Sequence, residues 1–356
     1  MACPARGQLG EGNIRIHSRK PARYRCTVCH TTFSHRAGTI FFRRRTDEQT
    51  ITQVVTLVSH GCPVPAIEAA FDVQAQTVRE WVDAAGTHAE AVHHAEVVQP
   101  RDLVQVQADE IHVKTQAGVL WMAMAMMVST RLWLGGAVSP HRDRHLIGHL
   151  VAIVAACATW GPLLFVSDGL VTYIDAVRKA FRTRQTGTGG RPRLIGWPDL
   201  AIAQVVKQYA GRAVRGTIHR LVHGRVPVFL TLLWSTPGCQ VLNTAFIERL
   251  NGTFRSRLAV LGRRTRCAAR RAATVTRGMY LVGTVYNFCS VHCSLTLDNG
   301  DRQTPAMAAG ITDHVWTVGE LLWRRVPPRR WEPPRRRGRR SKAVQALVDR
   351  WCPLHR

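Results

Sequence analysis

Three acidic residues stand where carboxylates could hold a divalent cation. Asp109 ends the strand-like run VQVQADEIHV, Asp168 ends LLFVSDGL, and Glu248 lies in NTAFIERLNGTFRSRL, which has helical spacing. Mg²⁺ prefers oxygen ligands, and a pair of such ions can activate water and stabilise the leaving oxygen in phosphodiester chemistry. The pattern therefore indicates a metal-dependent phosphodiester site, although each carboxylate alone could pair with an arginine, cap a helix or lie on a solvated helix face.

The helix predicted around Glu248 carries further polar side chains at spacings of three and four. Asn251 and Arg255 follow the glutamate by one and two turns, so we expect both to face the substrate whose phosphodiester meets the carboxylates, and we expect Arg255 to hold a phosphate. A basic run continues this surface, with Arg263, Arg264 and Arg266. A solvated helix face remains the alternative for each arginine.

Two neighbouring groups leave alternatives open. Glu110 follows Asp109 directly, and side chains alternate along a strand, so Glu110 should point to the opposite face. We assign the metal role to Asp109, and an exchange of roles between Asp109 and Glu110 stays open.

A second metal site could be formed by Cys289, His292 and Cys293. One C-x3-C with an internal histidine is a weak pattern, however, and we expect a small buried cluster.

The order Asp109, Asp168, Glu248, followed by Asn251 and Arg255, resembles the catalytic core of DDE transposases and retroviral-type integrases. The segments IERLNGTFRSRLAVLGRRTR, YNFCSVHCSLT and RQTPAMAAGIT are similar to those of bacterial insertion-sequence transposases that begin with a zinc ribbon and a helix-turn-helix. The resemblance covers residues 1–320 and is most specific over 243–310. It implies an α/β, RNase H-like fold, with both aspartates on neighbouring strands and the glutamate on a later helix.

The same resemblance implies an activity and its partners. It implies two Mg²⁺ or Mn²⁺ ions on the three carboxylates, strand cleavage and strand transfer by direct transesterification, and binding to both terminal inverted repeats and target DNA. Joining two element ends implies a homodimer or a larger homo-oligomer. Two alternatives remain: a catalytically inactive, transposase-derived DNA-binding regulator, and a host RNase H-like repair nuclease, which would not explain a helix-turn-helix.

The apolar body that must position the carboxylates spans residues 101–320. Strand-like runs at 103–113, 119–128 and 163–166 alternate with helix-like runs such as 145–157, which is an α/β pattern. Asp168 and Glu248 are 80 positions apart (248 − 168), well beyond the short integrase spacing, so we expect an insert near 182–240 to fold aside. Its Gly/Arg-rich part, Arg182–Arg193, is predicted to be a mobile loop.

Residues 47–95 precede this body with three helical patterns typical of a helix-turn-helix. The third pattern begins after Asp72-Val73-Gln74, and Gln74 stands where a serine or threonine cap is usual. The outward positions Gln76, Thr77 and Arg79 suit the DNA major groove. An ordinary three-helix packing unit with a solvated polar face is the alternative. The buried faces are predicted from Ile51, Val54, Val55 and Val58, from Ile67, Ala70 and Phe71, and from Val78, Trp81 and Val82.

Residues 1–46 lack apolar periodicity and contain Cys26-x2-Cys29, which resembles one knuckle of a zinc ribbon. Cys3 would belong to the other knuckle, but Arg6 stands where its second cysteine is expected. The fourth Zn²⁺ ligand could be His17 or His30, or a cysteine upstream of Met1 if this chain begins late. Free surface thiols are the alternative.

Charge and composition restrict the setting. The 356 residues carry 49 Lys and Arg against 23 Asp and Glu, a formal net charge of +26, which favours nucleic acid as a partner. No apolar run reaches the about 18 residues of a membrane span, and we see no signal peptide. Ten unpatterned cysteines favour a reducing compartment, so we expect a soluble, cytoplasmic, nucleoid-associated bacterial protein. Prolines and like charges predict a disordered basic tail over 324–356.

Overall fold

The computed structural model describes residues 3–8, 10–185, 193–211, 213–236, 238, 240–262, 267–297, 300–328, 330–333 and 338–352. The chain forms two compact units, one of residues 1–46 together with 323–356 and the other of residues 47–322. None of the helices in these described ranges is both long enough and apolar enough to cross a membrane.

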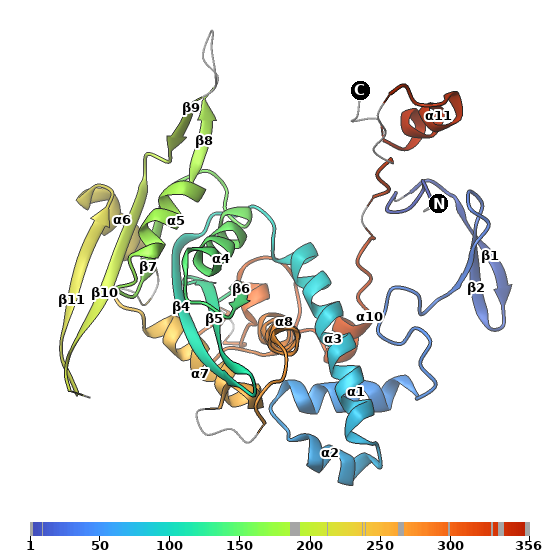
Figure 1. Ribbon diagram of the computed structural model, residues 1–356, viewed down its shortest axis with the longest axis horizontal. Helices are drawn as coiled ribbons and strands as arrows, with labels where there is room; N and C mark the ends of the chain where they lie inside the picture. Colours follow the sequence, from blue (N-terminus) through green and yellow to red (C-terminus); the bar gives the residue numbers. More distant parts are fainter. Residues whose placement is uncertain are drawn as a thin grey trace. The chain divides into compact units, whose positions relative to one another are not determined.

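A six-stranded mixed sheet forms the centre of the larger unit (Figure 1). Its order is β11-β10-β7-β4-β5-β6; β4, β5 and β6 are successive antiparallel neighbours, β7 and β10 run parallel to β4, and β11 is antiparallel to β10. The predicted α/β class is confirmed. The strands are β4 (Val104–Thr115), β5 (Gly118–Met127), β6 (Trp133–Ser139), β7 (Leu163–Ser167), β10 (Leu200–Ala210) and β11 (Ala213–His223).

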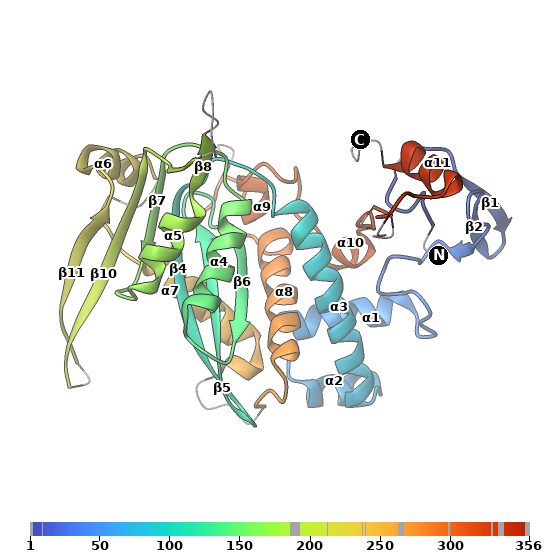
Figure 2. The same ribbon diagram turned by 45° about the horizontal axis from the view of Figure 1, so that its top comes forward.

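Helices cover both faces of this sheet (Figures 1 and 2). Helices α4 (Arg144–Ala156) and α5 (Thr172–Ala180) lie on one face, and α6 (Val226–Ser235) and α7 (Ala245–Arg257) lie on the other. Helix α8 (Ala272–Cys289) packs beside β6, where the Asn287 amide bonds both the backbone N–H and the carbonyl of Trp133. Short helices η1 (Ala259–Leu261), α9 (Pro305–Ala308) and α10 (Val318–Trp323) complete this part of the chain.

The prediction that residues 182–240 form an insert that folds aside is wrong for the two longest strands of this segment, β10 and β11. Strands β10 and β11 extend the main sheet, because the first six residues of β10 are buried and the first five of them pair with β7. The hairpin of β8 (Arg182–Gln185) and β9 (Arg193–Gly196) forms a separate two-stranded sheet. The middle of the predicted mobile loop, residues 186–192, lies outside the described residues.

Three helices open the larger unit: α1 (Glu48–Ser59), α2 (Val64–Phe71) and α3 (Ala75–Glu96). Asp72 ends α2 in the left-handed region, and Gln74 makes no side-chain cap. Glu68 of α2 replaces that cap, since its carboxylate accepts the backbone N–H of Ala75 at 2.6 Å. Ala70, predicted to face the core, is exposed. These helices belong to the same compact unit as the sheet, and α3 reaches it through His93, whose Nε2 contacts the carbonyl of Leu134 at 3.0 Å.

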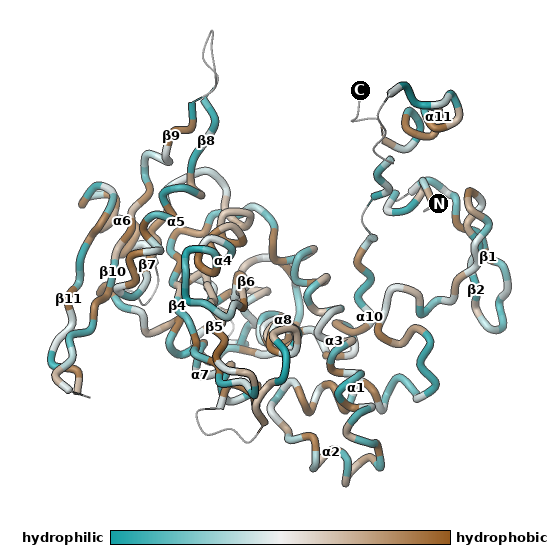
Figure 3. Tube along the Cα trace, viewed as in Figure 1, coloured by the Kyte–Doolittle hydropathy of each residue, from teal (hydrophilic) through white to brown (hydrophobic). Residues whose placement is uncertain are grey.

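The smaller unit combines the two ends of the chain. Its sheet consists of β1 (Ile14–Arg19), β2 (Ala22–Cys26) and β3 (Thr32–Ser34), all antiparallel. The predicted disordered tail is wrong for residues 342–351, which form α11 (Lys342–Trp351). Hydrophobic and hydrophilic residues alternate along α11 (Figure 3), and its apolar face packs in a small core. That core contains Ala5, Trp331, Val348 and Trp351.

Candidate active site

Strand register brings Asp109 and Asp168 together. Gln107 of β4 is paired with Val166 of β7 in parallel, so the residues two positions later emerge side by side. One carboxylate oxygen from each of Asp109, Glu110 and Asp168 lies within 4.8 Å of the other two. The turn after β7 fixes Asp168, because its Oδ1 accepts the N–H of Leu170 at 3.0 Å.

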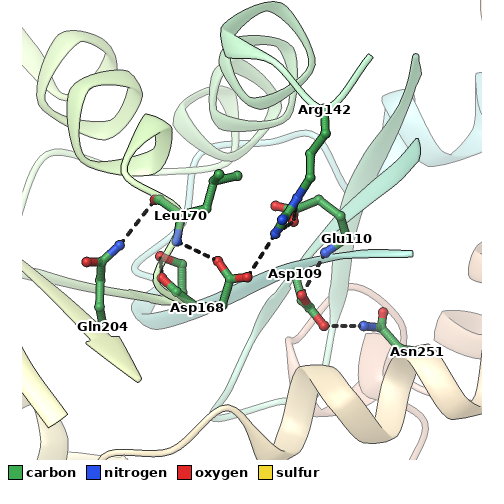
Figure 4. Close-up of polar contacts among 8 residues, drawn as sticks. Asp109, Glu110, Arg142, Asp168, Leu170, Gln204 and Asn251 are labelled. Carbon is green, nitrogen blue, oxygen red and sulfur yellow. Dashed lines mark hydrogen bonds and ion pairs between the residues drawn. The ribbon is translucent and has the colours of Figure 1, made fainter. Parts of the chain in front are cut away.

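Helix α7 is attached to the same strand by one buried amide. Gln107 donates to the carbonyl of Asn243 at 2.8 Å and accepts the N–H of Ile247 at 3.1 Å. This anchor aims Asn251 at the carboxylates, and its Nδ2 donates to Asp109 Oδ2 at 2.7 Å (Figure 4). Asn251 is only 2% exposed, so the structure makes it a partner of Asp109 rather than the free DNA contact expected from helical spacing.

Glu248 lies one turn before Asn251 and has partners of its own. Its Oε1 accepts hydrogen bonds from Lys207 Nζ at 2.7 Å and from Thr244 Oγ1 at 2.9 Å. Burial acts to raise the pKa of Glu248, but these two donors outweigh it and lower the pKa. Glu248 is outside the group of three close carboxylates, although its charge contributes to raising the pKa of Asp109.

Glu110 also contributes a carboxylate to the site, although the alternation of side chains along the strand predicted that it would point away from Asp109. Arg142 donates to Glu110 Oε2 through Nε at 2.9 Å and Nη2 at 2.6 Å, and the same Nη2 donates to Asp168 Oδ2 at 2.9 Å (Figure 4). Because Asp168 follows the last residue of β7, its carboxylate can contact groups from both faces of the sheet. The Glu110 side chain is fully buried, whereas a third of the Arg142 side chain is exposed.

The electrostatics of the site favour a bound cation. Burial, together with the charges of Glu110, Asp168 and Glu248, raises the pKa of Asp109 to about 7. Burial also raises the pKa of Glu110, although the Tyr173 hydroxyl and the pairing with Arg142 act to lower it. The buried Oδ1 of Asn251 lacks a hydrogen-bond partner within the described part of the chain. Oxygen donors of this number and spacing fit a hard divalent cation.

The residues predicted to contact DNA fall into three groups. Gln76 and Arg79 are exposed on the first turns of α3, and Thr77 between them is half-buried. Arg255 is half-buried on α7, beside a pocket at the far end of β4. Arg263 and Arg264, like Arg266, lie outside the described residues.

The smaller unit brings Cys3, Cys26 and Cys29 together, with their sulfur atoms within 4.8 Å of one another. The Cys3 and Cys26 sulfurs are 3.9 Å apart, close to the about 3.8 Å that two thiolates span on a tetrahedral zinc with bonds of about 2.3 Å. Burial acts to raise the pKa of Cys26, but the backbone N–H groups of Cys29 and Val28 outweigh it and lower the pKa to about 7. Thiols in this arrangement fit Zn²⁺.

The cysteine group offers three ligands, whereas a structural zinc takes four. Neither His17 nor His30 belongs to it in the portion of the chain that the structure describes.

The predicted buried cluster of Cys289, His292 and Cys293 is wrong. Cys293 is exposed, and His292 instead accepts hydrogen bonds from Ser294 through Nδ1. Cys289 is the last residue of α8, and His292 and Cys293 come after its C-cap, Ser290.

Sequence reasoning missed Arg142 and Lys207, which complete the carboxylate site. Each comes from an element remote in sequence from its partner, and no spacing rule connects Lys207 with Glu248. Comparison with known proteins adds no further residue, because no protein-family model and no curated protein matches the chain.

Proposed function

We propose that the chain is a DDE-type DNA transposase, with Asp109, Asp168 and Glu248 as its catalytic carboxylates. The observation that carries the proposal is the convergence of two aspartates from neighbouring parallel strands with a helix that bears the glutamate. This arrangement is the one that the sequence resemblance implies for an RNase H-like fold. The clustering of oxygen donors supports binding of two Mg²⁺ or Mn²⁺ ions.

Each side chain then has a definite task. Asp109 presents its oxygens from within β4, Asp168 presents them from the position directly after β7, and Glu248 adds a third carboxylate from α7. Bound divalent ions supply an activated water or 3′-OH and stabilise the leaving oxygen of the phosphodiester. Asn251 positions Asp109, and Arg142 holds Asp168 against Glu110, so the carboxylates keep their places between the cleavage and joining steps.

Recognition of DNA ends is assigned to the N-terminal part of the chain. Gln76, Thr77 and Arg79 begin α3, where a helix can enter the major groove and contact base edges. The cysteine group would bind one structural Zn²⁺ and stabilise a second DNA contact. The net charge of +26 supports a polyanionic partner, and joining two element ends calls for at least two copies of the chain.

The test is a cleavage assay on a labelled duplex that carries the terminal repeat of the chain's own element. Wild-type protein should nick one strand at the repeat boundary with Mg²⁺ and not with chelator. Asp168→Asn should lower the rate about a thousandfold or more, a loss of about 4 kcal/mol in transition-state stabilisation. Asp175→Asn, which removes an exposed acid of the neighbouring helix α5, is the matched control and should cleave normally.

Tight binding to the repeat without nicking under any divalent metal would overturn the proposal that the chain is an enzyme. The DNA-binding regulator would then be the remaining interpretation. Nicking of any duplex irrespective of sequence would instead support the repair nuclease.

A further inference from the structure

Glu248 is the one carboxylate of the proposed function that stands apart from the others. Its Oε1 accepts hydrogen bonds from Lys207 Nζ at 2.7 Å and from Thr244 Oγ1 at 2.9 Å. Among the described residues, it does not belong to the group of three carboxylates whose oxygens lie within 4.8 Å of one another. The lysine and the threonine therefore hold the glutamate outside the group that it is expected to complete.

The helix that carries Glu248 is nevertheless already docked on the strand that carries Asp109. Ile247, the residue before Glu248, donates its N–H to Gln107 of β4 at 3.1 Å. Asn251, one turn after Glu248, reaches Asp109 Oδ2 at 2.7 Å (Figure 4). A glutamate side chain changes direction by moving between staggered rotamers. Rotation of this side chain, without movement of α7, is therefore enough to bring its carboxylate toward Asp109.

The register of β10 explains why Lys207 reaches Glu248. Gln204 of β10 pairs in parallel with Ser167 of β7, the residue before Asp168. Val205 comes next on β10 and is buried in the core between the sheet and helix α6. Side chains alternate along a strand, so Lys207 points to the same face as Val205, the face that α6 and α7 cover. Lys207 thus lies just beyond the strand end from which Asp168 emerges.

Both members of this ion pair are open to competing partners. The Lys207 and Glu248 side chains are 39% and 45% exposed, and an exposed ion pair contributes little to stability. The surrounding segment, residues 200–247, contains five Lys or Arg residues and no acid, so it attracts a polyanion. A phosphate can therefore compete for the lysine, and a divalent cation can compete for the glutamate.

We propose that the ion pair of Lys207 and Glu248 is a latch that couples cation binding to DNA binding. Lys207 leaves Glu248 when DNA attracts it, and Glu248 is then free to turn toward Asp109 and Asp168. A cation that attracts Glu248 releases Lys207 for DNA in the same way, so each ligand raises the affinity for the other by an equal factor. The latch deepens the proposed function and rests on it, because Glu248 is taken there as the third metal-binding carboxylate.

The first test is the Mn²⁺ affinity of the full chain without DNA, measured by calorimetry. Lys207→Met should bind Mn²⁺ about three- to fivefold more tightly than wild type, because an exposed ion pair no longer withholds Glu248. The same substitution in a Glu248→Gln background should change nothing, since no carboxylate remains to be released. Lys207→Arg keeps the ion pair and should bind Mn²⁺ as wild type does. Lys179→Met, which removes an exposed lysine from α5, is the control of equal net charge and should also match wild type.

Two results of this comparison would overturn the latch. Equal tightening with and without Glu248 would mean that Lys207 acts only by repelling the cation. Unchanged Mn²⁺ affinity in Lys207→Met, with its thermal unfolding intact, would mean that the ion pair does not restrain Glu248.

The second test is the affinity for a fluorescent terminal-repeat duplex, with Ca²⁺ or with chelator at equal ionic strength. Ca²⁺ takes oxygen ligands as Mn²⁺ does, and a gel checks that the duplex stays intact. Addition of Ca²⁺ should raise the DNA affinity of wild type about three- to fivefold more than that of Lys207→Met. Equal gains in both proteins would overturn the coupling. If no strand is cut with Mg²⁺, the proposed function fails, while the Mn²⁺ comparison still decides whether Lys207 competes with a cation for Glu248.

Discussion

The carboxylate site and the cysteine group are built in opposite ways. The carboxylate site joins residues as far apart as Asp109 and Asn251, 142 positions, and is held by strand pairing, a buried amide and the core beneath it. The cysteine group joins Cys3 and Cys26, only 23 positions apart, in a unit whose core cluster has four buried residues. A large core places ligands in advance of their metal, whereas a small unit depends on its metal for order.

Removing the cysteine ligands should therefore produce the largest effect on folding. Cys26→Ser takes one thiolate from a group whose zinc would contribute about 10 kcal/mol of apparent binding energy, so the unit of residues 1–46 and 323–356 should unfold. Hydrogen exchange of the full chain should show fast exchange in that unit alone. A zinc chelator should reproduce this in wild type.

Cys62→Ser provides the control, since this half-buried thiol lies between α1 and α2, outside the group. Protection that survives both Cys26→Ser and chelation would mean that α11 and its small core hold the unit without metal, and the contrast between the two regions would fail.

The larger unit should respond instead to pH, through His93. This side chain is fully buried against Trp133 and Tyr280, and burial lowers its pKa to about 3. In the unfolded chain the His93 imidazole binds a proton below about pH 6.5, whereas in the folded chain it stays neutral until about pH 3. Stability from the neutral imidazole is therefore complete above pH 6.5 and is lost as pH falls toward 3, by roughly 5 kcal/mol at most.

His93→Gln keeps a neutral donor near the carbonyl of Leu134 and should flatten this acid dependence in denaturant titrations between pH 4 and 7. Exposed His94→Gln should retain the wild-type slope. Equal slopes in wild type and His93→Gln would show that other groups cause the acid sensitivity of the larger unit.

Local patterns in the sequence were enough to predict the strands and helices that carry the site. Apolar runs and helical spacing predicted β4, β5, β7, α4 and α7, and the scarcity of acids in a basic chain pointed to Asp109 and Asp168. The buried run at the start of β10 has the same apolar character, but the long gap between Asp168 and Glu248 favours an insert over these residues.

Two kinds of feature could not be obtained from those patterns. Arg142 and Lys207 reach their carboxylates only through tertiary packing, so nothing local distinguishes them from other surface charges. The tail was judged by its arginines and prolines, which hid the apolar spacing of Val344, Leu347, Val348 and Trp351. A short amphipathic helix needs a partner surface, and that surface comes from the other end of the chain.

The smallest of these predicted effects on stability concerns the amide that ties α7 to β4. Gln107→Leu has similar bulk but leaves the Asn243 carbonyl and the Ile247 N–H without their partner, which should cost about 2 kcal/mol in denaturant unfolding. Because α7 then loses its register against Asp109, cleavage should slow about tenfold or more at saturating DNA, with little change in DNA affinity. Exposed Gln208→Leu on β10 is the control and should alter neither quantity. Normal cleavage by a destabilised Gln107→Leu protein would mean that packing of Phe254 and Ile247 in the core already fixes α7, and that the amide adds stability without setting the geometry of the site.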